Sequence, residues 1–209
     1  MRAQDVHMCI RHGADVLGFV VEYPRPVPWN LSAAAARELL AAVGKPTQTC
    51  VVTGGSPDHV LRMADATKPD YIQLHGGETL ADTTCLVGEL AKRGIKVIKA
   101  LFPDTPDLEK AAVDFCAAGV YALLFDPRTP ANASHSGTAD LPAYRRLRRA
   151  ASCPTILAGG ITPENAREIV RQTQARMIDL MSGVEISPGI KDAVKLAALF
   201  RALRGGSRP

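Results

Sequence analysis

The fold is decided by a segment in which an apolar run passes directly into the start of a helix, PTILAGGITPEN, residues 154–165. Its first part, Pro154–Ala158, is almost entirely apolar, and the two glycines after it, Gly159 and Gly160, allow a tight turn. The Thr-Pro-Glu after them is typical of a helix N-terminus. An apolar run without polar alternation predicts a strand that is covered on both faces, as in a parallel sheet. The segment therefore predicts one unit of strand, turn and helix.

The same order of strand and helix recurs along the whole chain. The predicted strands are Val16–Val21, Thr47–Val52, Tyr71–Leu74, Ile95–Ala100, Tyr121–Phe125, Pro154–Ala158 and Met177–Met181. The predicted helices are Gln4–Arg11, Ser32–Val43, Pro57–Ala66, Thr79–Gly94, Leu108–Ala117, Pro142–Ala151, Thr162–Gln172 and Asp192–Leu203. Repeated units of this kind, with right-handed crossovers, form either a closed barrel or an open doubly wound sheet. No GxGxxG motif follows an early strand, which favours the barrel.

We therefore predict an α/β protein with a (βα)₈ TIM barrel fold, built as a single domain from residues 1–209. Seven strands but eight helices are recognisable, because Gln4–Arg11 has no strand before it. The expected barrel is thus truncated at its N-terminus. Its two unpaired sheet edges would also allow a homodimer. Arg128–Asp140 is predicted to be a long polar loop.

The composition limits the classes of partner. A formal net charge of +4 is mildly basic, and the cluster of arginines at 145–149 is explained by an exposed helix more simply than by nucleic acid. No stretch approaches the ~20 apolar residues of a membrane span. The five cysteines are scattered and lack CxxC or zinc-site spacing. We therefore predict reduced thiols, no metal site and a cytoplasmic protein that binds neither nucleic acid nor membrane.

The glycine-containing turns after the last two predicted strands are candidates for a phosphate site. Gly159 and Gly160 follow one strand, and Ser182 and Gly183 follow the next. Backbone N–H groups in such turns, together with helix N-termini, can surround an anion, and this pair of loops is the usual phosphate site of a barrel. The alternative is that these glycines only form tight turns. Their presence in both loops favours the phosphate site.

Other polar residues stand at or just after strand ends, where barrels carry their chemistry. Asp126 can serve as a general acid or cap a helix, and Asp179 can act as a second carboxylate or orient loop backbone. His75 can polarise a substrate group or bond to neighbouring backbone. Lys99 can form an imine, although a salt bridge at the barrel rim is more common. Arg25 can clamp a carboxylate or remain solvated.

Taken together, these segments resemble phosphoribosylanthranilate isomerase, from Arg2 to the final helix. The elements that carry the resemblance are HGADVLGF (12–19), YIQLHG (71–76), VIKA (97–100), LAGG (157–160), Asp179, SGVE (182–185) and SPGIKD (187–192). The resemblance implies a barrel that converts N-(5-phosphoribosyl)anthranilate into an open-chain ketose phosphate. This is an Amadori rearrangement of tryptophan biosynthesis. It implies a small phosphorylated substrate and no metal or organic cofactor.

The resemblance also implies roles for individual residues. Asp126 matches the acid that protonates the furanose ring oxygen, and the two glycine-containing loops match the phosphate site. Arg25 is a substitute for the arginine that binds the anthranilate carboxylate. His75 and Asp179 are expected to contact the substrate.

The expected general base is a cysteine thiolate on a first strand that carries Lys-x-Cys-Gly-x-Thr. Arg2–Val6 matches the family's residues directly after that motif, so the base is expected upstream of Met1. Cys9 lies on the first helix and cannot replace it, whereas the direction of Cys50 depends on strand register. An alternative is a catalytically impaired homologue that binds a phosphorylated ligand without turnover. A pentose-phosphate epimerase is disfavoured, because its metal-binding His/Asp set is missing.

Overall fold

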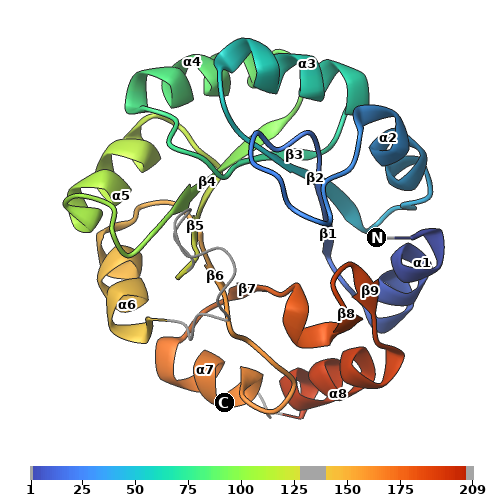
Figure 1. The fold of residues 1–209 in the computed structure, drawn as a ribbon. Coiled ribbons are helices and arrows are strands. Elements are labelled where there is room, and N and C mark those ends of the chain that lie inside the picture. Colours follow the sequence, from blue (N-terminus) through green and yellow to red (C-terminus); the bar gives the residue numbers. More distant parts are fainter. Residues whose placement is uncertain (1, 128–139, 206–209) are drawn as a thin grey trace.

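The computed structural model describes residues 2–127 and 140–205, in which seven parallel strands curl into an incomplete barrel inside a ring of helices (Figure 1). The strands are β1 (Val16–Val20), β2 (Gln48–Thr53), β3 (Tyr71–Leu74), β4 (Lys96–Leu101), β5 (Ala122–Phe125), β6 (Thr155–Ala158) and β7 (Met177–Asp179). The helices are α1 (Ala3–His12), α2 (Ala33–Ala41), α3 (Pro57–Thr67), α4 (Leu80–Ala91), α5 (Leu108–Ala117), α6 (Leu141–Ala150), α7 (Ala166–Thr173) and α8 (Ala193–Arg204). A 3₁₀ turn (Ser182–Val184) and the hairpin of β8 (Glu185–Ser187) and β9 (Ile190–Lys191) separate β7 from α8. Among the described helices, none has the length and apolarity needed to cross a membrane.

The sheet follows the order of the sequence from β1 to β7, and every neighbouring pair is parallel. The predicted α/β barrel architecture is confirmed, with seven strands in the barrel sheet and eight α-helices in the described residues. Within those residues β1 pairs only with β2, and β7 pairs only with β6, so these two strands are the sheet edges. The loop predicted at Arg128–Asp140 lies, apart from Asp140, outside the described residues.

The strand register explains why the strands carry apolar residues on both faces. Alternate residues of a strand point to opposite faces. Leu17 and Phe19 of β1 point outward and pack into the large cluster beneath the helices. The opposite face lines the barrel interior with a second cluster: Cys50, Tyr71, Ile98, Ala100, Phe102, Ala122, Leu124 and Ala158. Since both faces are covered, neither requires polar residues.

The helix starts agree with the sequence, with one informative exception. Ser32 and Ser56 accept hydrogen bonds from the first turns of α2 and α3, at the predicted starts of these helices. However, α7 begins at Ala166 rather than at Thr162. The side chain of Asn165 accepts from Thr162 N at 2.8 Å and donates to Gly160 O at 2.8 Å, which holds the Thr-Pro-Glu segment as a turn.

A disulfide joins Cys116 at the end of α5 to Cys153 before β6, with 5.6 Å between their Cα atoms. The prediction of reduced thiols is therefore wrong for this pair. The two cysteines are 37 residues apart in sequence. They meet because the following unit packs its helix α6 beside α5, a proximity that sequence spacing does not reveal.

Helix α1 packs against α8 and β9 at the open side of the barrel (Figure 1). Its Asp5 is fully buried, pairs with Arg2 at 3.0 Å, and accepts from the backbone N–H of Lys191 at 3.4 Å. Burial by itself would raise the pKa of Asp5, but the hydrogen bonds from Arg2 hold it below its usual value. The carboxylate thereby ties the first helix to the last part of the chain.

Candidate active site

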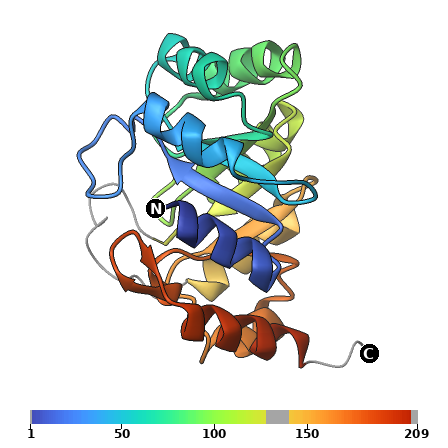
Figure 2. The same ribbon diagram turned by 90° about the vertical axis from the view of Figure 1, so that its right-hand side faces the viewer.

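The polar residues of the site meet at one end of the barrel, because the carboxyl ends of parallel strands share one end. In Figure 2 the loop that follows β1 and the β8–β9 hairpin both lie at that end of the barrel, on the left of the view. The candidate residues predicted at the strand ends therefore belong to one region of the molecule.

The two predicted phosphate loops are in direct backbone contact. A Cβ atom on Gly183 would lie 1.9 Å from the carbonyl oxygen of Ile161, so only glycine fits at that position. Gly159 has a φ of 82° and Gly160 one of 64°, both in the left-handed region that favours glycine. Ser182 begins the 3₁₀ turn beside them. The structure thus brings together all four residues predicted to bind phosphate.

Asp126 lies between this pair of loops and His75. Its side chain is 1% exposed, and its Oδ2 is 3.6 Å from Nε2 of His75. On its other side, a Cβ atom on Gly159 would lie 3.4 Å from Asp126 Oδ1. Asp126 is not a helix cap, since α6 is capped by Asp140. A shielded carboxyl beside a turn predicted to bind phosphate can donate a proton to a substrate held there.

The loop after β1 folds over the barrel mouth. Its ends are bridged between Val21 and Leu31, and the side chain of Asn30 bonds to both backbone polar groups of Tyr23, at 2.9 Å and 3.0 Å. The hydroxyl of Tyr23 donates to the backbone oxygen of His75 at 2.9 Å. Burial raises the pKa of Tyr23, and the positive charge of Arg25 partly opposes this. Arg25, the residue predicted to bind a carboxylate, therefore lies near the same rim of the barrel as Tyr23.

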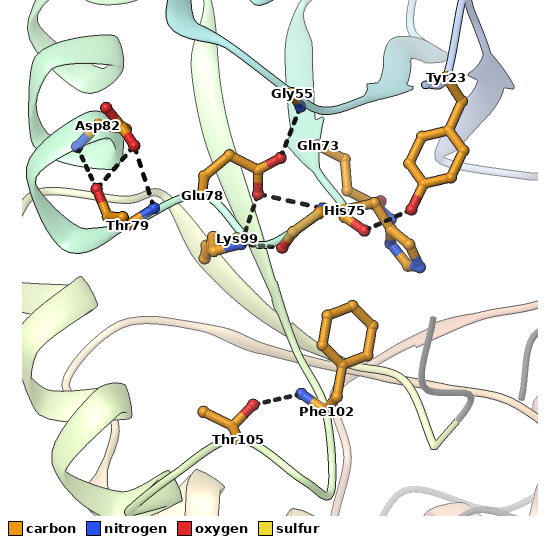
Figure 3. A network of polar contacts seen from close by, with 11 residues as sticks. Tyr23, Gly55, Gln73, His75, Glu78, Thr79, Asp82, Lys99, Phe102 and Thr105 are labelled. Atoms are coloured by element: carbon orange, nitrogen blue, oxygen red, sulfur yellow. Dashed lines mark hydrogen bonds and ion pairs between the residues drawn. The ribbon is translucent and has the colours of Figure 1, made fainter. Parts of the chain in front are cut away.

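A buried ion pair holds the loops after β2 and β3 (Figure 3). Lys99 Nζ is 2.7 Å from Glu78 Oε2, and the two side chains are 3% and 1% exposed. Glu78 also accepts from Gly76 N at 3.1 Å and Gly55 N at 3.2 Å, while Lys99 donates to Gly76 O at 2.9 Å. Burial lowers the pKa of Lys99, against the effect of the adjacent carboxylate. Of the two interpretations of Lys99, the structure supports the salt bridge at the rim.

In the observed strand register Cys50 pairs with Tyr71, and both side chains face the barrel interior. Burial raises the pKa of its thiol, and the charge of Asp179 raises it further. Asp179 pairs in register with Ala158, an interior residue, and therefore faces the same space. A thiol held in its protonated form is a poor base, so Cys50 is not suited to the role of the thiolate that the family resemblance implies. Among the described residues the other free thiols, Cys9 and Cys85, lie on outer helices.

Several residues of the site were not predicted as such. Gln73 and Glu78 flank His75 within one sequence segment, and the QLHG motif was a signal for the first of them. Tyr23 carries no motif, because its role depends on a contact with His75 far along the chain, whereas Asn165 acts locally, through its bond to Gly160. In the part of the chain that the structure describes, no group of three or more His, Cys, Asp and Glu side chains is arranged to hold a metal ion.

Comparison with known proteins identifies the relatives of this chain. The family model described as N-(5'-phosphoribosyl)anthranilate isomerase matches residues 1–202. The protein of that name from Rhodopseudomonas palustris is 36% identical over 197 residues, covering 92% of this chain and 87% of the relative. The one from Haloferax volcanii is 36% identical over 194 residues, covering 92% and 84%.

Solved structures agree with the sequence relatives. The crystal structure of phosphoribosyl anthranilate isomerase from Thermus thermophilus superposes with a TM-score of 0.82 at 30% identity, covering 98% of this chain and 95% of that one. The structure from Thermotoga maritima gives a TM-score of 0.82 at 26% identity, covering 99% and 96%. The barrel, the converging strand ends and these matches lead to one conclusion: the chain belongs to the N-(5'-phosphoribosyl)anthranilate isomerase family.

Proposed function

We propose that this protein isomerises N-(5'-phosphoribosyl)anthranilate, with Asp126 as the general acid. The observation that carries the proposal is the position of Asp126, which is buried between His75 and the Gly159 turn. A relative was solved with reduced 1-(o-carboxyphenylamino)-1-deoxyribulose 5-phosphate, a phosphorylated compound that carries a carboxyphenyl group. The phosphate of this compound corresponds to the proposed phosphate loops of this chain, and its carboxyphenyl group corresponds to the rim near Arg25.

In the proposed reaction the substrate phosphate is bound by backbone N–H groups of Gly159, Gly160 and Gly183 and by Ser182. This fixes the furanose ring over the mouth of the barrel, so that little freedom is lost in the chemical step. Asp126 donates its proton to the ring oxygen. The C1′–O bond breaks, and the nitrogen lone pair forms the imine.

A base then takes the C2′ proton, which gives an enolamine. The enol loses its O–H proton and C1′ gains a proton, which gives the ketone and leaves the total number of protons unchanged. The reaction is an isomerisation, so no external reductant or oxidant is needed. At the other end of the substrate Arg25 is proposed to bind the carboxyphenyl group, while His75, beside Asp126, and Asp179 are proposed to contact the rest of the substrate. The raised pKa of Cys50 argues against this thiol as the base of the second step.

The test measures turnover of N-(5'-phosphoribosyl)anthranilate by the purified protein, and the loss of anthranilate fluorescence reports the conversion. It is run on this chain and on one extended by the in-frame codons upstream of Met1. We expect Asp126→Asn to lower kcat by about 10²–10⁴-fold, while binding of the reduced substrate analogue is retained. Binding without turnover by either length of chain would instead support a homologue that binds a phosphorylated ligand and does not catalyse.

The oligomeric state belongs to the same proposal. A phosphoribosylanthranilate isomerase from Thermotoga maritima is described as dimeric. The edge strands β1 and β7 give this chain a surface through which a homodimer could form. Light scattering coupled to gel filtration measures the mass in solution, and a mass of one chain at micromolar concentration would refute the dimer.

A further inference from the structure

The amide of Gln73 is hydrogen-bonded to the imidazole of His75. Gln73 lies on β3 and is 6% exposed, and its Nε2 is 2.9 Å from Nδ1 of His75 (Figure 3). In this orientation the amide nitrogen of Gln73 faces Nδ1, and because an amide nitrogen donates, Nδ1 accepts and carries no proton. A neutral imidazole whose Nδ1 accepts carries its proton on Nε2.

The backbone that carries this ring is fixed on both sides. The N–H of His75 donates to Thr53 O at 2.9 Å, and its carbonyl accepts from Tyr23 Oη at 2.9 Å. The next residue, Gly76, is bonded through both its N–H and its C=O to the buried Glu78–Lys99 pair.

Aromatic side chains restrict the ring itself. Phe102 lies edge-on at 5.5 Å between ring centroids, and Tyr23 does so at 6.3 Å. With the backbone and two ring faces constrained, the imidazole is held with one nitrogen toward Gln73 and the other, Nε2, toward Asp126 at 3.6 Å.

We propose that Gln73 is a positioning residue that holds His75 in its uncharged form with the proton on Nε2, facing Asp126. This rests on the proposed function, in which Asp126 must carry a proton in order to donate it. A cationic imidazole at 3.6 Å would stabilise the ionised carboxylate, which cannot donate. A neutral N–H in the same place faces the carboxyl group without adding charge.

Other charged groups near this pair must be considered. Arg25 approaches from the loop after β1, Asp179 faces the interior from β7, and Glu78 with Lys99 forms a buried pair of opposite charges. Burial raises the pKa of Tyr23, and the charges of Glu78 and Asp126 add to this, so its hydroxyl remains a neutral donor to His75 O. The tautomer of His75 is therefore set by Gln73, which is its direct partner at Nδ1.

The direct test is imidazole ¹⁵N NMR of the wild-type protein near pH 7. The chain has five histidines, and the signals of His75 are identified by their loss in His75→Asn. We expect the pattern of a neutral ring protonated at Nε2. Protonation at Nδ1, or at both nitrogens, would overturn the proposal. Since this measurement needs no turnover, it separates the tautomer from the proposed activity.

A charge-introducing variant tests the functional consequence. In Gln73→Glu the new carboxylate accepts a hydrogen bond from a protonated Nδ1 and stabilises the imidazolium, so His75 should become doubly protonated near pH 7 in the NMR spectrum. The cation favours ionised Asp126, and we expect kcat on the alkaline side of the pH profile to fall about tenfold, with a small change in KM. Gln73→Leu should give a mixture of the two neutral tautomers.

Gln48→Glu is the matched control. Gln48 is at the opposite end of β2 from the mouth and accepts from the Tyr71 hydroxyl at 2.8 Å, a bond that a carboxylate also accepts. This variant should leave the His75 spectrum and the pH profile unchanged. If Gln73→Glu behaves like Gln48→Glu in both measurements, the positioning role is wrong. If the spectra respond as expected but no variant turns over substrate, the tautomer assignment stands and the proposed activity fails.

Discussion

Replacing Lys99 by methionine should destabilise the protein far more than the loss of an ordinary ion pair. Lys99 and Glu78 are 3% and 1% exposed at the side chain, and their charged atoms are 2.7 Å apart. In Lys99→Met, Glu78 keeps two backbone N–H donors, from Gly76 and Gly55, but loses its only counter-charge among the contacts described. Breaking one side of a buried pair costs about 3–5 kcal/mol.

The assay is urea unfolding followed by circular dichroism, with Lys110→Met as the control. Lys110 forms an exposed i,i+4 pair with Asp114, and such pairs contribute about 0.3–0.5 kcal/mol. For a chain of this size, a loss of 3–5 kcal/mol corresponds to a fall in Tm of roughly 10 °C.

The double variant Lys99→Met/Glu78→Gln removes the unpaired charge and should recover part of the lost stability. If Lys99→Met loses no more than the Lys110→Met control, or if the double variant is worse than the sum of its parts, the reasoning about this pair is refuted.

Three further predictions concern other parts of the molecule. Gly183→Ala places a Cβ atom 1.9 Å from Ile161 O and should raise KM roughly tenfold or more, whereas Gly88→Ala, with open space around it in α4, should leave KM unchanged; equal KM values would contradict the contact. Cys116→Ser opens a disulfide that closes a 37-residue separation, and should lower the free energy of unfolding by up to about 4 kcal/mol in urea; reductant should do the same to the wild type and nothing further to the variant. The hydrogen bonds from Arg2 lower the pKa of Asp5 in the folded protein, so the ionised carboxylate stabilises the fold at pH values above its unfolded pKa of about 3.9, and this stabilisation is lost as the pH falls through the folded-state pKa. Asp5→Asn should therefore flatten the dependence of unfolding free energy on pH in that acidic range, and an unchanged dependence would argue against the role of Asp5.

The fold could be predicted from local patterns because each unit encodes its own strand and helix. Apolar runs such as Ala122–Phe125 need no information from elsewhere in the chain, and serine caps mark helix starts directly. The last strand was predicted too long, as Met177–Met181, because Ser182 starts a 3₁₀ turn that draws the chain out of the sheet after Asp179.

The site could be predicted only where a residue's position in the unit carries the signal. Asp126 and His75 were found because they stand at strand ends. The partner of Lys99 could not be named from the sequence, since Glu78 meets it only when β3 and β4 pair. The disulfide escaped prediction for the same reason: proximity between units is a property of the folded ring.

The open edges of the sheet have a consequence for the motions of the backbone. In the described chain, β4 is bonded to a strand on each side, whereas β1 and β7 are each bonded on one side only. Amide protons exchange with solvent through local opening, and a strand held from one side opens at lower free energy. Deuterium uptake should therefore be slowest at β3–β5 and rise toward both edges. Because β7 leads into the Ser182–Gly183 turn, half of the proposed phosphate site lies next to an edge strand that opens early. A bound phosphorylated ligand should therefore slow deuterium uptake in β7 and this turn more than anywhere else.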